Sequence, residues 1–124
     1  ALATIIMADA QVRWLLERGG MSAVSAHCAQ ASSLIYDWAE ANLAARPFVE
    51  NPEWRSPVTA TIEIDEAVSA AELAAHLHTR GVVDIGAYRG VGVNQLRIGT
   101  WPSVDIDDVE ALLACIDYCL ERVL

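Results

Sequence analysis

Apolar side chains recur at helical spacing in two stretches near the N-terminus. The first stripe consists of Ile5, Ala8, Val12 and Leu15. Because Gly19 and Gly20 follow, and glycine commonly ends a helix, the pattern predicts an amphipathic helix that stops there. The second stripe consists of Val24, Cys28, Ala31, Ile35 and Trp38. Ser22 is its expected N-cap, and the helix should end before Arg46 because a residue that precedes proline disfavours helical geometry.

A change of period marks the middle of the chain. Residues 46–57 contain three prolines and show no period, so we expect a connector there. Residues 58–64 then alternate apolar and polar side chains, which indicates a strand with one buried face. Ser69 and Glu72 match a capping box that opens a short helix, and Gly81 stands where that helix should stop.

The last third of the chain predicts two more strands and a helix. Residues 82–85 and 95–100 are each expected to form a short strand. In the second of them Leu96 and Ile98 share one face while Arg97 lies on the other. A stripe at spacings of three and four then continues to the C-terminus and consists of Ile106, Val109, Leu113, Ile116, Leu120 and Val123. This rhythm predicts an amphipathic final helix.

These elements give two helices followed by a β-α-β-β-α unit. We therefore predict an α/β (α+β) fold in which a small, mostly antiparallel sheet carries its helices on one face. Seventeen acidic residues against eight basic ones, all arginine, leave no basic surface for nucleic acid. No apolar run approaches the roughly 20 residues that a membrane helix needs. The three cysteines fall within helical patterns, which favours a reducing, cytoplasmic setting, and the start at Ala1 suggests part of a longer protein.

Two features could recognise an anionic ligand. Arg97 should project from the sheet face that the helices leave uncovered, and an arginine held on a strand offers a planar fork for a carboxylate. A solvated or salt-bridged strand arginine is the alternative. In the loop 86–92, Tyr88 and Arg89 stand between glycines, where the backbone can approach a phosphate closely. The loop lacks the ending of a phosphate-cradling P-loop, and a plain hairpin connection is the alternative.

Other polar groupings have structural explanations, and no metal site is expected. His76 and His78 cannot share a helix face at a spacing of two. Cys115 and Cys119 do share one, but without further ligands core packing is the better interpretation. The carboxylates at 105–108 stand at the start of the final helix, where negative charge complements the helix dipole.

The combination of residues 81–84, the pair Tyr88-Arg89 and residues 94–98 resembles the phosphoserine aminotransferases. The segment 2–20 also resembles the part of these proteins that follows their Asn-Thr-Pro cofactor-phosphate motif. The resemblance implies the class V, fold-type-I architecture: a large domain whose lysine carries pyridoxal phosphate, a small C-terminal domain, and a homodimer. Residues 1–21 would then be a helix remnant of the large domain, and residues 22–124 would be the small domain.

The resemblance also implies roles for three side chains. Arg97 matches the arginine that holds the substrate α-carboxylate, and Arg89 matches one that recognises the phosphate of phosphoserine. Tyr88 matches a neighbour that is histidine in many relatives, and a phenol can still donate to phosphate. The implied reaction is reversible amino transfer between glutamate and 3-phosphohydroxypyruvate in serine biosynthesis. Because the chain has no lysine, it should hold no cofactor-binding residue and be inactive alone.

Two alternatives stay open. The parent could be another class V aminotransferase acting on alanine or glyoxylate, in which case Arg89 would meet no phosphate. The chain could also be a stand-alone module that binds a small ligand or a partner through its uncovered sheet face.

Overall fold

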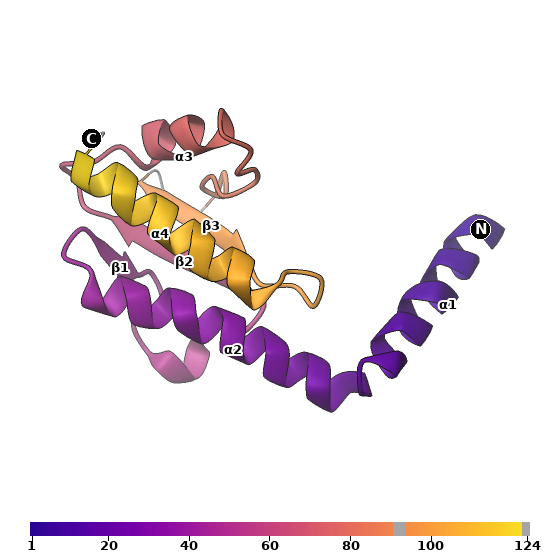
Figure 1. Cartoon of the computed structure of the whole chain (residues 1–124). Coiled ribbons are helices and arrows are strands. Elements are labelled where there is room, and N and C mark those ends of the chain that lie inside the picture. The colour runs from indigo at the N-terminus through magenta and orange to yellow at the C-terminus, as the bar shows by residue number, and fades with distance from the viewer. Residues whose placement is uncertain (91–93, 123–124) are drawn as a thin grey trace.

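The chain folds into a small antiparallel sheet with helices on one side and a projecting first helix (Figure 1). The computed structural model describes residues 1–90 and 94–122. The elements in chain order are α1 (Leu2–Glu17), α2 (Gly20–Ala41), β1 (Ala45–Pro47), the 3-10 helix η1 (Pro52–Trp54), β2 (Thr59–Ile64), α3 (Ala70–His78), β3 (Gln95–Gly99) and α4 (Ile106–Arg122). The strands lie in the order β1-β2-β3, and both pairs are antiparallel.

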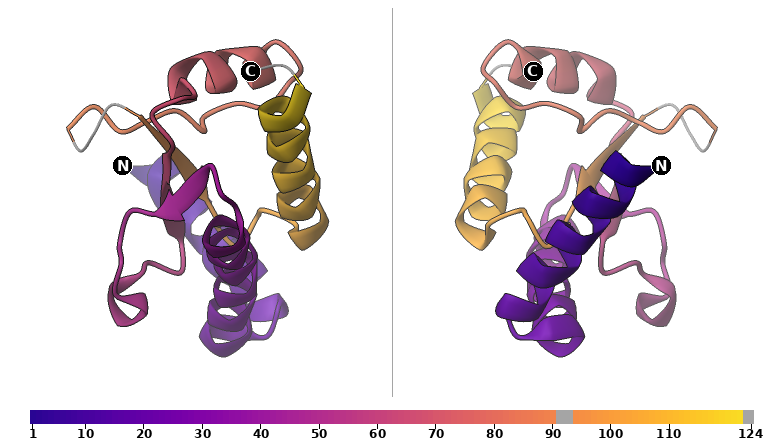
Figure 2. Two further views of the ribbon diagram at one scale, coloured as in Figure 1. Left: turned by 90° about the vertical axis from the view of Figure 1, so that its left-hand side faces the viewer. Right: turned by 90° about the vertical axis from the view of Figure 1, so that its right-hand side faces the viewer.

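One face of the sheet forms the core. The alternation in β2 buries Ala60, Ile62 and Ile64, and β3 adds Leu96 and Ile98. The helices α2, α3 and α4 bury their apolar stripes on this face, mainly through Ala31, Ile35, Leu73, Leu77, Val109 and Ile116. They lie on the same side of the sheet (Figure 2). The predicted fold class and the one-sided arrangement of the helices are therefore confirmed.

The strand assignments need two corrections. Residues 82–85 form a turn instead of a strand, because Gly81 and Asp84 have left-handed backbones, with φ of 94° and 60°. Only a bridge between Gly86 and Leu96 remains there. The predicted connector, in turn, begins with the short strand β1, so the observed order after the two helices is β-β-α-β-α. The proline of β1 is tolerated because this strand lies at the edge of the sheet.

Most helix boundaries follow the predicted signals. The glycines at 19 and 20 end α1 as expected, but α2 begins at Gly20 with Gly19 as its N-cap, so the assignment of Ser22 as N-cap was wrong. Gly19 adopts a φ of 95°, which favours glycine. Ser69 is the N-cap of α3 as predicted, since its hydroxyl accepts from the Glu72 amide at 3.2 Å. Val123 of the final stripe lies outside the described residues.

The first helix projects away from the rest of the molecule (Figures 1 and 2). None of its residues is buried. Its apolar side chains are largely exposed, among them Leu2, Ile5, Ile6, Met7, Val12 and Leu16. Among the helices that the structure describes, none combines the length and the apolar character that a bilayer span requires. The predicted helix is thus confirmed, but none of its apolar side chains is buried within the described chain.

Candidate functional site on the open face of the sheet

The sheet face opposite the core carries the predicted ligand residue. We call it the open face and define it by Arg46, Thr61, Glu63, Gln95 and Arg97. The strand register places Arg46, Glu63 and Gln95 in one row across the sheet, and Thr61 faces Arg97 in the next row. Because side chains alternate along a strand, these residues point away from the core formed by their neighbours.

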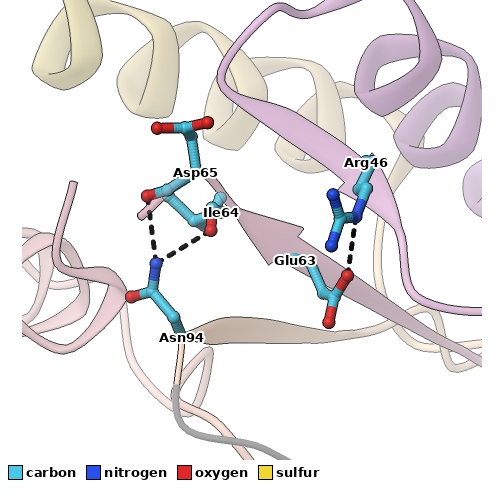
Figure 3. Close-up of polar contacts among 5 residues, drawn as sticks. All are labelled: Arg46, Glu63, Ile64, Asp65 and Asn94. Carbon is cyan, nitrogen blue, oxygen red and sulfur yellow. Dashed lines mark hydrogen bonds and ion pairs between the residues drawn. The ribbon is translucent and has the colours of Figure 1, made fainter. Parts of the chain in front are cut away.

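The two arginines of the open face differ in their surroundings. Arg46 donates to Glu63 at 2.7 Å (Figure 3). The hydrogen bond to Glu63 and the charge of its carboxylate raise the pKa of the Arg46 guanidinium. Arg97 is exposed and forms no hydrogen bond or ion pair with another side chain that the structure describes. Its guanidinium donors are therefore available to an anion.

The loop before β3 brings Tyr88 to Arg97. The Arg97 amide donates to the carbonyl oxygen of Ile85 at 2.9 Å, and Gly86 is bridged to Leu96, so the loop leaves the sheet beside Arg97. The Arg97 Cζ atom lies 5.1 Å from the centroid of the Tyr88 ring. Arg89 is exposed, and no described contact joins it to Arg97. Residues 91 and 92 of the predicted loop lie outside the described residues.

Asn94 fixes the start of the strand that carries Arg97. Its amide nitrogen lies 2.8 Å from the carbonyl oxygen of Ile64, 3.1 Å from that of Asp65 and 2.9 Å from that of Val68. Its Oδ1 accepts from the amide of Ala70, the first residue of α3, at 2.8 Å. Figure 3 shows the side chain reaching across to the end of β2. Sequence reasoning missed this residue, although asparagine's tendency to bond nearby backbone groups is a signal for it.

A cavity of about 750 Å³ lies between β3, the turn at 81–85 and α4. Arg97 and Trp101 both line it. The Trp101 ring packs against Gly99, where an added Cβ would lie only 2.8 Å from the indole nitrogen. Trp101 therefore lies at the same cavity as Arg97.

A second, polar groove lies at the β1 side of the sheet. It has a volume of about 570 Å³ and is lined in part by Arg46, Glu63, Asn94 and Gln95. The Gln95 side chain is buried, and its Oε1 has no hydrogen-bond partner among residues 1–90 and 94–122. The strand alternation placed Gln95 on the Arg97 face, but nothing in the pattern singled it out.

The comparison with curated sequences points to one group of proteins. The chain is 46% identical over 123 residues to a relative from Mycolicibacterium vanbaalenii and 42% identical over 121 residues to a phosphoserine aminotransferase of Corynebacterium glutamicum. These alignments cover 99% and 98% of this chain. The chain is homologous to the C-terminal portion of phosphoserine aminotransferases. It spans about a third of the length of the curated relatives that it matches, 33% and 32% of these two.

The solved structures show the same fold. A phosphoserine aminotransferase from Bacillus circulans superposes with a TM-score of 0.76 at 26% identity, over 86% of this chain and 29% of that one. An alanine–glyoxylate aminotransferase from a Nostoc species also has a TM-score of 0.76, at 17% identity, over 87% of this chain and 28% of that one, which shows the fold alone. No model of a protein family matches the chain.

The described residues do not fit the attachment of a pyridoxal phosphate like that of the phosphoserine aminotransferases. The cofactor is held through a lysine amine, and the sequence contains no lysine. Metal ligation has no candidate either, because no group of three His, Cys, Asp or Glu side chains gathers among residues 1–90 and 94–122. Cys119 is buried, as core packing predicted, whereas Cys115 is exposed. Chemically, this portion of the chain offers the exposed guanidinium groups of Arg97 and Arg89 and the Tyr88 ring that lies beside Arg97.

Proposed function

We propose that this chain is the substrate-recognition portion of a phosphoserine aminotransferase. In this proposal Arg97 binds the α-carboxylate that glutamate and phosphoserine share, and Arg89 binds the phosphate. The parent protein transfers an amino group between glutamate and 3-phosphohydroxypyruvate in the cytoplasm. The observation that carries the proposal is the homology along 98–99% of the chain to proteins of that name.

The charges on the open face support the carboxylate role of Arg97. Arg46 already has its acidic partner, whereas Arg97 has none among the described residues and keeps its planar donors free. A guanidinium can bind a carboxylate through two parallel hydrogen bonds, which a lysine ammonium cannot do. A strand residue also presents this group with little freedom of the backbone. Of the two alternatives, a salt-bridged strand arginine describes Arg46 and not Arg97, and the mutations below distinguish a ligand-binding Arg97 from a solvated one.

The domain division follows from the same proposal. Residues 1–21 would belong to the large domain, which accounts for the exposed apolar stripe of α1, and residues 22–124 would form the small domain. The large domain, with the cofactor lysine, would lie outside this chain, and the parent would be a homodimer. Pyridoxal phosphate would supply the electron sink for amino transfer. The chain alone would bind no cofactor covalently and would be inactive.

Mutation of the two arginines in the full-length protein tests the proposal. Arg97→Ala should lower the catalytic efficiency of both half-reactions by about ten- to hundredfold, since a charge-assisted pair contributes about 1.5–3 kcal/mol. Arg97→Lys should recover only part of that loss. Arg46→Ala is the matched control, because that arginine of the same face is already paired. Stopped-flow half-reactions measure each substrate separately, and unchanged rates for Arg97→Ala with intact circular dichroism would return Arg97 to a solvated surface role.

A second candidate is an aminotransferase for alanine or glyoxylate. The Nostoc alanine–glyoxylate aminotransferase has the same TM-score as the Bacillus phosphoserine aminotransferase, so the fold alone does not decide between the two reactions. The two candidates differ at the distal end of the substrate, where Arg89 has a ligand only if a phosphate is present. Arg89→Ala should therefore weaken phosphoserine and leave alanine as donor unaffected if the first proposal holds. Equal turnover of alanine and phosphoserine by the unmodified protein would favour the second.

A further inference from the structure

We propose that Tyr88 is a positioning residue for Arg97: its ring holds the guanidinium ready for the substrate carboxylate, and its hydroxyl takes no part in phosphate recognition. The inference rests on the proposed function, because it concerns how Arg97 meets that carboxylate. It departs from the reading of Tyr88 as a phosphate ligand.

The contact between the two side chains is of the cation–π kind. The Arg97 Cζ atom lies 5.1 Å from the Tyr88 ring centroid, inside the range of about 6 Å in which a ring face attracts a guanidinium. Both residues come from one hydrogen-bonded unit, since the Arg97 amide donates to Ile85 and Gly86 is bridged to Leu96. Tyr88 therefore lies only two residues after Gly86, which is bridged to the strand that carries Arg97.

A comparison with Arg55 shows what the ring does for Arg97. Arg55 also lies over a ring, that of Tyr36 at 5.0 Å, but its guanidinium is paired with Glu40 at 2.6 Å and bonded to backbone carbonyl oxygens. The N–H donors of Arg55 are therefore already bonded within the folded chain. Arg97 has the ring contact without any such partner among the described residues. A ring face attracts the positive charge without using the N–H groups, so the donors of Arg97 remain available for a ligand.

An ordered guanidinium binds more tightly than a mobile one. An exposed arginine has many rotamers, and a ligand that immobilises it must offset the lost entropy. A ring that already restricts Arg97 reduces this cost for any substrate that carries the α-carboxylate. The benefit depends on the ring and not on the phenol oxygen, so phenylalanine should replace tyrosine at this position without loss.

The test uses two simple inhibitors of the full-length protein. Butyrate offers a lone carboxylate and inorganic phosphate a lone phosphate, and their competitive inhibition constants report on the two subsites separately. Tyr88→Leu should raise the inhibition constant of butyrate by about two- to thirtyfold. This range is the ratio of inhibition constants that corresponds to losing a cation–π contact of about 0.5–2 kcal/mol. The same substitution should leave the inhibition constant of phosphate unchanged. Tyr88→Phe should behave as the unmodified protein with both inhibitors. Because Tyr88 is exposed, neither substitution should disturb the fold, and circular dichroism checks this.

A double-mutant cycle shows whether Tyr88 acts through Arg97. In the Arg97→Ala background, Tyr88→Leu should have no further effect on butyrate. If Tyr88→Phe weakens phosphate as much as Tyr88→Leu does, the hydroxyl contacts phosphate and the inference is overturned. If Arg97→Ala weakens butyrate but Tyr88→Leu does not, the inference fails and the proposed function stands. If Arg97→Ala leaves butyrate unchanged, the proposed function itself fails.

Discussion

Replacing Asn94 by alanine should be the most damaging single change to the strand that carries Arg97. The side chain makes four contacts of 2.8–3.1 Å that join the end of β2, the start of α3 and the start of β3. An amide group has only two hydrogens, so about three full hydrogen bonds exist at any moment. At about 0.5–1.5 kcal/mol each, Asn94→Ala should lower the free energy of unfolding by about 2–4 kcal/mol.

Equilibrium urea unfolding of the chain, followed by far-ultraviolet circular dichroism, measures this loss. Asn51→Ala is the matched control, because the Asn51 side chain accepts a single hydrogen bond, from the Glu53 amide at 3.0 Å. Loss of that cap should cost about 0.5–1 kcal/mol. Asn94→Asp should cost at least as much as Asn94→Ala at neutral pH, since a carboxylate would face three carbonyl oxygens. If Asn94→Ala proves no more costly than Asn51→Ala, the reasoning about this network is refuted.

Three further predictions concern the rest of the molecule. Burial raises the pKa of the Tyr36 phenol, against the lowering effect of Arg55. The contribution of Tyr36 to the free energy of unfolding should therefore be complete below the pKa of tyrosine in the unfolded chain, about 10, and should fall as the pH rises above that pKa. Tyr36→Phe should remove this alkaline loss in urea titrations at several pH values. Gln95→Met removes a buried, unpartnered oxygen and should leave thermal stability unchanged or raise it. Treatment of the chain with pyridoxal phosphate and borohydride should label only the N-terminal amine in mass spectra.

The parts of the fold that were predictable depend on neighbours in the sequence. The N-cap at Ser69 and the alternation of Leu96, Arg97 and Ile98 involve residues within a few positions of one another. They survive in the structure as expected. Strand β1 was missed because its three residues are too few for a period, and its pairing with β2 is set by a partner 15 or more positions away. The turn at 82–85 was mistaken for a strand because its valines favour extended structure, whereas Gly81 and Asp84 bend the backbone.

The same distinction between sequence neighbours and distant residues applies to the candidate site. Arg97 could be predicted on the open face because strand alternation decides which way a side chain points. Its contact with Tyr88 could not, because it depends on the bridge that returns the loop to β3. Gln95 shows the limit most plainly. It points to the same face as Arg97, yet it is buried and Arg97 is exposed, a difference that arises from what lies over each residue and not from their positions along the strand.

The apolar side chains of α1 also depend on neighbours that the sequence pattern does not reveal. Periodicity predicts a helix with a buried stripe, and α1 forms the helix but leaves Ile5 and Val12 of that stripe 64% and 53% exposed. A helix of 16 residues is marginally stable in water by itself, so such a stripe normally marks a surface that packs against something. Because the chain spans about a third of its curated relatives, the proposed large domain accounts for that partner without any change to the fold described. In the proposed division of the chain, the apolar side chains of α1 would therefore be the surface that packs against the large domain.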